Sequence, residues 1–249
     1  MTAAMEWMGS YALLLRWQGL RFRQVMPFVV IVQFFTGIGT VIGFGFLIPK
    51  LDTASATYLV TGAPTLTLIT LGLVLVPQLV AARKAEGSLE YMWSLPISRM
   101  AYLAADLTIW MIATMPGLIV ALIVGSMKYD FTLQVSPLSV PVFMLIVLTA
   151  TTVGYAIAVL SPKPELVNLI TNFIIFGLFL FSPINFPAER LPNWLADLHS
   201  VLPVKYAADA VRGTLVKGYG EDLWLAIAVL GVWCLIGLGI NYFMVTRRK

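Results

Sequence analysis

Apolar residues along this chain are gathered into long blocks separated by short polar segments. A helix that crosses the ~30 Å hydrocarbon core of a bilayer needs about 20 mostly apolar residues, because each residue advances the helix by about 1.5 Å. Six blocks meet this requirement, and none alternates as a membrane β-strand would. The pattern therefore predicts an all-α integral membrane protein with six transmembrane helices, near residues 28–48, 58–82, 101–126, 138–160, 166–184 and 223–245.

The composition agrees with the block pattern. Of the 249 residues, 59% are hydrophobic and 11% are charged, with a mean hydropathy of +0.90. Soluble domains are about 45–50% apolar and about 25% charged, so a water-soluble fold is excluded. The single cysteine, Cys234, cannot form an intrachain disulfide, and with the single histidine, His199, it offers no cluster for a metal site.

The Lys and Arg residues predict the orientation of the chain. An even number of spans puts both termini on one side, and the loops of that side contain the larger share of the basic residues: Arg16, Arg21, Arg23, Arg83, Lys84, Arg99, Lys163, Arg247, Arg248 and Lys249. Positive loops stay on the cytoplasmic side, so we expect both termini in the cytoplasm and the chain in the plasma (inner) membrane. Cytoplasmic charge facing anionic lipid also accounts for the net charge of +4 without nucleic acid.

Residues 5–26 are predicted to form a separate helix that lies on the membrane interface. Arg16 and Arg23 share one side of it, and Trp7 and Trp17 can serve as interfacial anchors. A role in contacting a partner is the alternative.

The cytoplasmic segment 83–99 is predicted to contain a short helix. Gly87 can end the second span, Ser88 can cap the new helix, and Ser98 can cap the third span. The short helix contains Leu89, Met92 and Trp93 next to Glu86 and Glu90. We interpret the apolar side chains as exposed, and therefore as a docking surface.

The long segment 182–222, predicted to be external, is divided by prolines into short helical pieces that lie on or dip into the outer interface. Lys205, Asp209 and Arg212 share a helix face, which favours a solvated salt-bridged helix over a substrate-binding one. The candidate residues of this external segment are Pro187, Pro192, Pro203, Tyr206, Asp209 and Arg212.

Two spans contain stripes of uncharged polar residues. Gln33, Thr36 and Thr40 lie on one face of the first span, and Asn168 and Asn172 on one face of the fifth. Such stripes either line a translocation path or hold helices together, and composition does not separate the two. Asp106 lies near the cytoplasmic end of the third span, where an interfacial or capping role is favoured over gating. Because no ionisable residue lies near the middle of a span, coupling to a proton or sodium gradient is disfavoured.

Several motifs together resemble the ABC transporter type-2 permease family over essentially the whole chain. They are residues 86–90, 94–99, 191–195 and 202–212, with Pro187. The resemblance implies a membrane subunit that dimerises with a second copy or a sister permease and pairs with two separate ATPase subunits. It further implies an exporter of drugs, lipids or polysaccharides, and a coupling helix formed by Glu86, Gly87, Leu89, Glu90, Met92 and Trp93. The polar stripes are then expected at the dimer seam.

The chain has no Gly-x-x-x-x-Gly-Lys-Ser/Thr loop, so we expect ATP and Mg²⁺ to bind on the partner ATPase and no cofactor to bind here. The absence of midplane charges favours a hydrophobic or amphipathic cargo such as a drug, antibiotic or lipid. Two alternatives remain. One is an integral membrane lipid-modifying enzyme that uses Asp197, His199 and Asp209, and the other is a non-transporting membrane scaffold.

Overall fold

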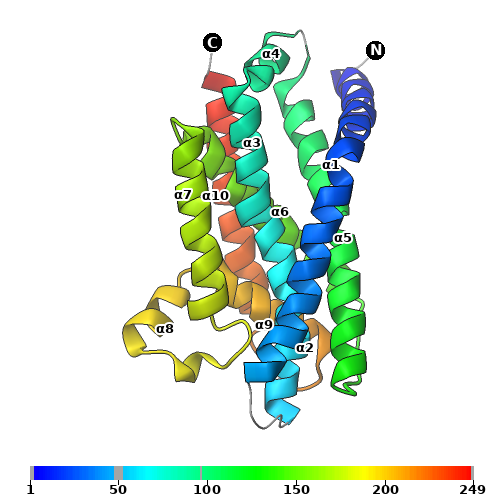
Figure 1. The fold of residues 1–249 in the computed structure, drawn as a ribbon. Helices are drawn as coiled ribbons and strands as arrows, with labels where there is room; N and C mark the ends of the chain where they lie inside the picture. Colours follow the sequence, from blue (N-terminus) through cyan, green and yellow to red (C-terminus); the bar gives the residue numbers. More distant parts are fainter. Residues whose placement is uncertain (1–2, 48–52, 96, 248–249) are drawn as a thin grey trace.

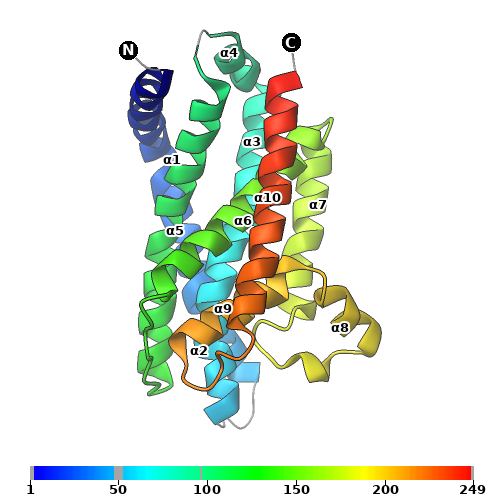
Figure 2. The same cartoon turned by 180° about the vertical axis from the view of Figure 1, so that it is seen from behind.

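The computed structural model describes residues 3–47, 53–95 and 97–247, and the regular structure of these residues is entirely helical. Figures 1 and 2 show an elongated bundle of roughly aligned helices. One end holds both chain ends and the short helix α4 (Ser88–Ser94), and we call it the α4 end. The opposite end holds α8 (Asn193–His199) and α9 (Pro203–Leu215), and we call it the α9 end.

Six helical segments of the described chain are long and apolar enough to span a bilayer, which confirms the predicted all-α membrane fold. Their elements are α1 (Ala3–Leu47), α2 (Thr53–Thr70) with η1 (Leu71–Leu75) and α3 (Val76–Ala85), α5 (Arg99–Lys128), α6 (Ser139–Leu160), α7 (Pro164–Phe176) with η2 (Gly177–Phe181), and α10 (Leu223–Arg247). Apart from the start of the first span, the observed ends lie within a few residues of the predicted ones, because polar residues mark the ends of the apolar blocks.

The first span differs from its prediction. The sequence suggested a separate helix over residues 5–26, but α1 continues through Pro27 without a break. Its first turns nevertheless do not follow the bundle axis. They overlap one another in both views (Figures 1 and 2), and Tyr11 bonds Thr108 whereas Gln18 bonds the carbonyl of Tyr102, which lies earlier on α5. The N-terminal part of α1 is therefore oblique to α5, and its place at the membrane interface stays a prediction.

The second span forms the centre of the bundle and crosses α6 at two glycines. A Cβ atom on Gly154 would collide with the carbonyl oxygen of Gly72, so the two backbones touch. At this crossing the helix widens into the π-helical turn η1, just before Pro77. Proline lacks the N–H that would bond the preceding turn, and π-turns accommodate such a break.

The chain after the fifth span returns into the bundle. It passes through the short 3₁₀ turn η3 (Ala188–Arg190) and α8, and then α9 packs against α10, α2 and α6. The apolar face of α9, including Val204, Val211 and Leu215, is part of the main core. The predicted short helices are therefore present, and α9 covers this end of the bundle, while their entry into the membrane from outside stays a prediction.

Candidate functional site

Helix α4 is set off from α3 by one left-handed residue. Gly87 has φ of +71°, a conformation that residues with a side chain rarely adopt, and it caps the start of α4. The Ser88 hydroxyl donates back to the carbonyl oxygen of Arg83 at 3.1 Å. On the far side, Ser98 caps α5 by accepting from the N–H of Ala101. Both breaks that the sequence predicted are observed, so α4 is a distinct element between the second and third spans.

The orientation of α4 corrects one sequence interpretation. Leu89 is 1% exposed and Met92 is 6% exposed, and both pack into the core cluster next to Tyr102 and Val245. They hold α4 on the bundle and are not an exposed docking surface. The exposed side chains on and beside α4 include those of Glu86, Glu90 and Tyr91. The side chain of Trp93 lies outside the part of the chain that the structure describes, as does residue 96.

Three basic residues beside α4 turn inward and bind other helices. Lys84 donates to the carbonyl oxygens of Val159 and Ser161 at the end of α6. Arg99 donates at 2.8 Å to the carbonyl oxygen of Val245, near the end of α10. These hydrogen bonds join the two helices that flank α4 to their neighbours, α3 to the end of α6 and α5 to α10.

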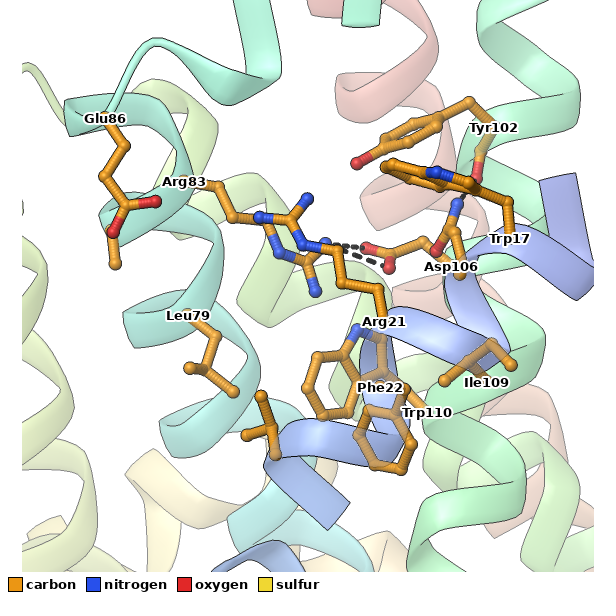
Figure 3. A pocket seen from close by; sticks show the side chains of 13 residues that line it. Trp17, Arg21, Phe22, Leu79, Arg83, Glu86, Tyr102, Asp106, Ile109 and Trp110 are labelled. Carbon is orange, nitrogen blue, oxygen red and sulfur yellow. Dashed lines mark hydrogen bonds and ion pairs between the residues drawn. The ribbon is translucent and has the colours of Figure 1, made fainter.

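The third basic residue, Arg83, forms an ion pair that crosses from α3 to α5. Its Nη1 lies 3.0 Å and 3.2 Å from the two carboxylate oxygens of Asp106, whose side chain is 2% exposed (Figure 3). Asp106 therefore does not cap the helix, as one expectation had it, and its depth at the membrane interface stays a prediction. The pair was missed because the two residues lie on different spans, although an acidic residue inside an apolar block is a signal for a buried partner.

The ion pair forms one wall of a polar cavity of about 190 Å³ between α1, α3 and α5, drawn in Figure 3. Trp17, Arg21 and Phe22 of α1 face Tyr102 and Trp110 of α5 across this space. The Arg83 guanidinium lies 5.9 Å from the centre of the Trp110 ring. The cavity therefore lies between α1 and the two spans that flank α4. The sequence had not predicted that these residues lie together.

At the α9 end, Arg212 is buried and holds the turn that follows the fifth span. Its Nη2 donates to the carbonyl oxygens of Pro183 and Ile184, and its Nη1 lies 2.7 Å from Asp209. Its guanidinium also lies 4.2 Å from the ring centre of Tyr58. Arg212 is 3% exposed, so the solvated salt bridge expected here is wrong.

Burial perturbs both partners of this pair. Loss of solvent raises the pKa of Asp209, and the nearby Arg212 opposes that rise. The same loss lowers the pKa of Arg212, and Asp209 opposes the decrease. Arg212 nevertheless stays cationic at neutral pH, because a guanidinium does not lose its proton in proteins. The pair lies beside a second polar hollow, of about 300 Å³, whose wall also includes Lys205 and Glu189.

The other residues selected in segment 182–222 act on its backbone. Pro187 precedes η3, Pro192 precedes α8, and Pro203 is the first residue of α9. Proline fits these positions because its φ suits the start of a helix and it has no N–H to leave unpaired. The Tyr206 hydroxyl donates to the carbonyl oxygen of Ser200 and so ties α9 to the end of α8.

The two polar stripes lie in different surroundings. Gln33 and Thr40 are buried, and Gln33 packs on Gly117 of α5 within the same chain. The hydroxyls of Thr36 and Thr40 donate to carbonyl oxygens of their own helix. Asn168 and Asn172 lie instead on an exposed face of α7. The stripes therefore do not meet within one chain.

The residues considered for a membrane enzyme do not converge. His199 borders an apolar cavity of about 450 Å³, whereas Asp209 borders the polar hollow beside Arg212, and Asp197 is exposed. His199 Nε2 is occupied by a 3.0 Å hydrogen bond to the carbonyl oxygen of Phe181. In the described part of the chain, no three His, Cys, Asp or Glu residues are grouped so that they could hold a metal ion.

Comparison with known proteins agrees with the architecture. A stretch of 65 residues, 25% of this chain, is 29% identical to ABC transporter G family member 20 of Dictyostelium discoideum and spans 9% of that protein. This chain therefore matches only a small part of that relative. A family model described as "ABC-2 type transporter" matches residues 10–216, a range that runs from α1 through α4 to the end of α9. Because this match covers most of the chain, the chain belongs to the ABC-2 type transporter family.

Proposed function

We propose that the chain is the membrane subunit of an ATP-driven exporter, and that α4 transmits force to it from a separate ATPase subunit. Membership of the family supports a transporter role. The anchored and exposed faces of α4 support its role in coupling. The proposed orientation puts the α4 end and both termini in the cytoplasm of a plasma-membrane protein, where an ATPase can reach α4. Two ATPase subunits and two membrane subunits form the proposed assembly.

The position of α4 is the observation that carries this proposal. Leu89 and Met92 anchor the helix in the core, while Glu86, Glu90 and Tyr91 face outward. A force applied to the exposed face would pass through the anchored side chains and the Arg83–Asp106 pair into α3 and α5. The outward carboxylates and the Tyr91 ring suit a socket with basic and apolar groups, because complementary charges orient two docking surfaces.

The test uses the full chain copurified with its ATPase and reconstituted in proteoliposomes. The variant Glu90→Lys with Tyr91→Ala reverses one charge and removes one ring from the exposed face of α4. We expect export per ATP hydrolysed to fall by about tenfold, since a single well-placed charged contact contributes roughly 1.5 kcal/mol or more. The matched control is Asp197→Lys, which reverses an exposed charge on α8 at the opposite end of the bundle.

Comparison of the α4 variant with its control separates force transmission through α4 from a general effect of surface charge. Loss of coupling in the α4 variant with normal coupling in Asp197→Lys supports force transmission through α4. Unchanged coupling in the α4 variant would contradict the proposal, and an equal loss in both proteins would assign the effect to surface charge in general.

We further propose that a second copy of the chain, or a sister permease, covers the exposed face of α7. Asparagine side chains are costly in contact with lipid, and Asn168 and Asn172 lie on that face. Cargo then passes beside this seam. The lack of ionisable groups at mid-membrane depth in the described spans favours a hydrophobic or amphipathic cargo such as a drug, antibiotic or lipid.

A further inference from the structure

A second cavity continues the polar one along the groove between α1 and α5. It measures about 110 Å³, and its wall is apolar, with Met26, Val29 and Ile112 among its residues. Phe22 and Ile109 belong to both cavities, so the two spaces adjoin. Met26 and Ile112 are exposed on the outside of the bundle, and the groove therefore opens toward the bilayer. One site is thus polar at its α4 end and apolar deeper in the membrane.

The wall of the polar cavity includes two arginines, Arg21 and Arg83, and two carboxylates, Asp106 and Glu86, and in the described structure only one of the arginines has a buried counter-charge. Arg83 is neutralised by Asp106, but among the described side chains Arg21 has no carboxylate within ion-pair distance. Its guanidinium is instead 5.8 Å from the ring centre of Trp17. Figure 3 shows Arg21 and Arg83 reaching the middle of the cavity while Glu86 lies at one side. Glu86 is exposed, so water screens its charge.

A buried donor in the same cavity lacks an acceptor. Trp110 is 1% exposed, and its indole Nε1 has no hydrogen-bond partner in the described structure. Indole N–H is only a donor, and burying it unpaired is costly. Figure 3 shows this nitrogen on the edge of the ring that faces Arg21 and Arg83. The missing partner is therefore a hydrogen-bond acceptor, and the two arginines favour an anionic one.

The size and position of the cavities distinguish a phospholipid head group from a small free anion. The polar cavity exceeds the ~15 Å³ needed by one water by more than tenfold, which leaves room for a phosphate group with bound water. The wall of the apolar cavity offers no polar group to a free anion, but it can pack against a hydrocarbon chain. The partly exposed rings of Trp7 and Trp17 are typical of side chains at head-group depth, and basic pockets between membrane helices hold anionic head groups.

We propose that the two cavities form one site for an anionic phospholipid. Its phosphodiester oxygens accept hydrogen bonds from Arg21 and from the indole N–H of Trp110, and one acyl chain lies in the apolar cavity. The bound lipid joins α1 to α5 next to the Arg83–Asp106 pair. This site needs neither ATP nor an ATPase, so the result of its test is independent of the proposed coupling role of α4.

The first experiment measures lipid binding to the purified full chain by native mass spectrometry. Phosphatidylglycerol should bind at least about fivefold more tightly than phosphatidylcholine. Arg21→Gln should weaken phosphatidylglycerol binding by roughly tenfold, the factor expected for one charge-assisted hydrogen bond. Arg23→Gln, which removes an exposed charge two residues away, is the matched control and should change binding by less than about twofold.

Two further variants separate loss of a contact from loss of folding. Trp110→Phe keeps an aromatic ring against Phe22 but removes the N–H, so it should weaken phosphatidylglycerol binding by about fivefold. Because the smaller ring leaves a void in the core, the thermal midpoint should fall, and binding is measured well below it. Arg21→Lys keeps the charge and should recover part of the affinity. If Arg21→Gln and Arg23→Gln weakened binding equally, general surface charge would explain the result and the site would be refuted.

The last arm distinguishes a lipid from a free phosphate. Millimolar inorganic phosphate should not displace phosphatidylglycerol, and displacement would identify a soluble-anion site instead. Phosphatidylglycerol with a diazirine midway along its acyl chain should label peptides that contain Met26 or Ile112. Labelling confined to other parts of the bundle would contradict the proposed position of the chain.

Discussion

At the scale of single residues, the contact between Gly72 and Gly154 sets how closely the second and fourth spans approach. A Cβ on Gly154 would meet backbone atoms, which cannot move aside as a flexible side chain can. We expect Gly154→Ala to destabilise the protein by about 1–3 kcal/mol through overpacking. The thermal midpoint in nanodiscs measures this effect.

A matched control for that substitution lies on α10. A Cβ on Gly239 would have no atom within 4 Å apart from its own helix. Gly239→Ala should therefore be neutral or stabilise the protein by up to about 1 kcal/mol, because alanine favours helix more than glycine does. Equal destabilisation by both substitutions would show that the close crossing is not the cause.

His199 makes the stability of the protein depend on pH. Burial lowers the pKa of His199, whereas an unfolded histidine titrates near 6.5. Below about pH 6.5 the unfolded state therefore binds more protons than the folded state, and stability falls as the pH decreases. The thermal midpoint should be lower at pH 5.5 than at pH 8. Because the chain has one histidine, His199→Gln should remove most of this difference.

At the scale of elements, the Arg83–Asp106 pair holds together the two helices that flank α4. Asp106→Asn leaves Arg83 without its counter-charge, and breaking such a buried pair costs about 3–5 kcal/mol. The double variant Arg83→Gln with Asp106→Asn removes both charges and should be more stable than the sum of the single losses predicts. Thermal unfolding of the three variants checks this, and strict additivity would argue against a direct coupling.

The short helix α4 also shows what a sequence leaves open at this scale. The breaks around it were predicted because glycine ends helices and serine caps them. The buried face of α4 was not predicted. A seven-residue helix has too few positions for the periodicity of its apolar residues to define one side. The exposed surface is therefore Glu86, Glu90 and Tyr91, and Leu89 and Met92 are anchors.

At the scale of the whole molecule, the spans are buried to very different extents. Within one chain 94% of the apolar window of the second span is buried, but only 17% of that of the fifth. The fifth span also places Asn168 and Asn172 on its exposed face. These observations support an assembly in which another membrane subunit covers α7.

The dimer gives a prediction at the same scale. Replacing Asn168 and Asn172 by leucine makes the face of α7 apolar, so the separated chains gain stability in lipid. We expect dimer dissociation to become about threefold to tenfold more favourable, at about 0.6 kcal/mol or more for each hydrogen bond lost between helices. Single-molecule photobleaching in dilute bilayers measures this equilibrium.

Gln33→Leu is the control variant for the asparagine replacements. Gln33 is buried against α5, and its Nε2 has no partner in the described structure. Leucine there should leave dimerisation unchanged and have little effect on stability. A stronger dimer after the asparagine replacements would contradict the proposed seam.

The sequence by itself determined the six spans, the breaks around α4 and the short helices between the fifth and sixth spans. These features depend on local quantities, namely the length of an apolar block, the position of a proline or glycine, and the small set of residues that cap helices. For the same reason, Pro187, Pro192 and Pro203 predicted where the short helices η3, α8 and α9 begin.

Only the tertiary structure decided which side chains meet. Arg83 and Asp106 pair across two spans, Arg212 is buried beneath the turn after the fifth span, and Gln33 packs inside the bundle while Asn172 does not. The rotation of each helix about its own axis fixes these contacts. In lipid, where the outside of the bundle is as apolar as its core, hydrophobic periodicity does not reveal that rotation.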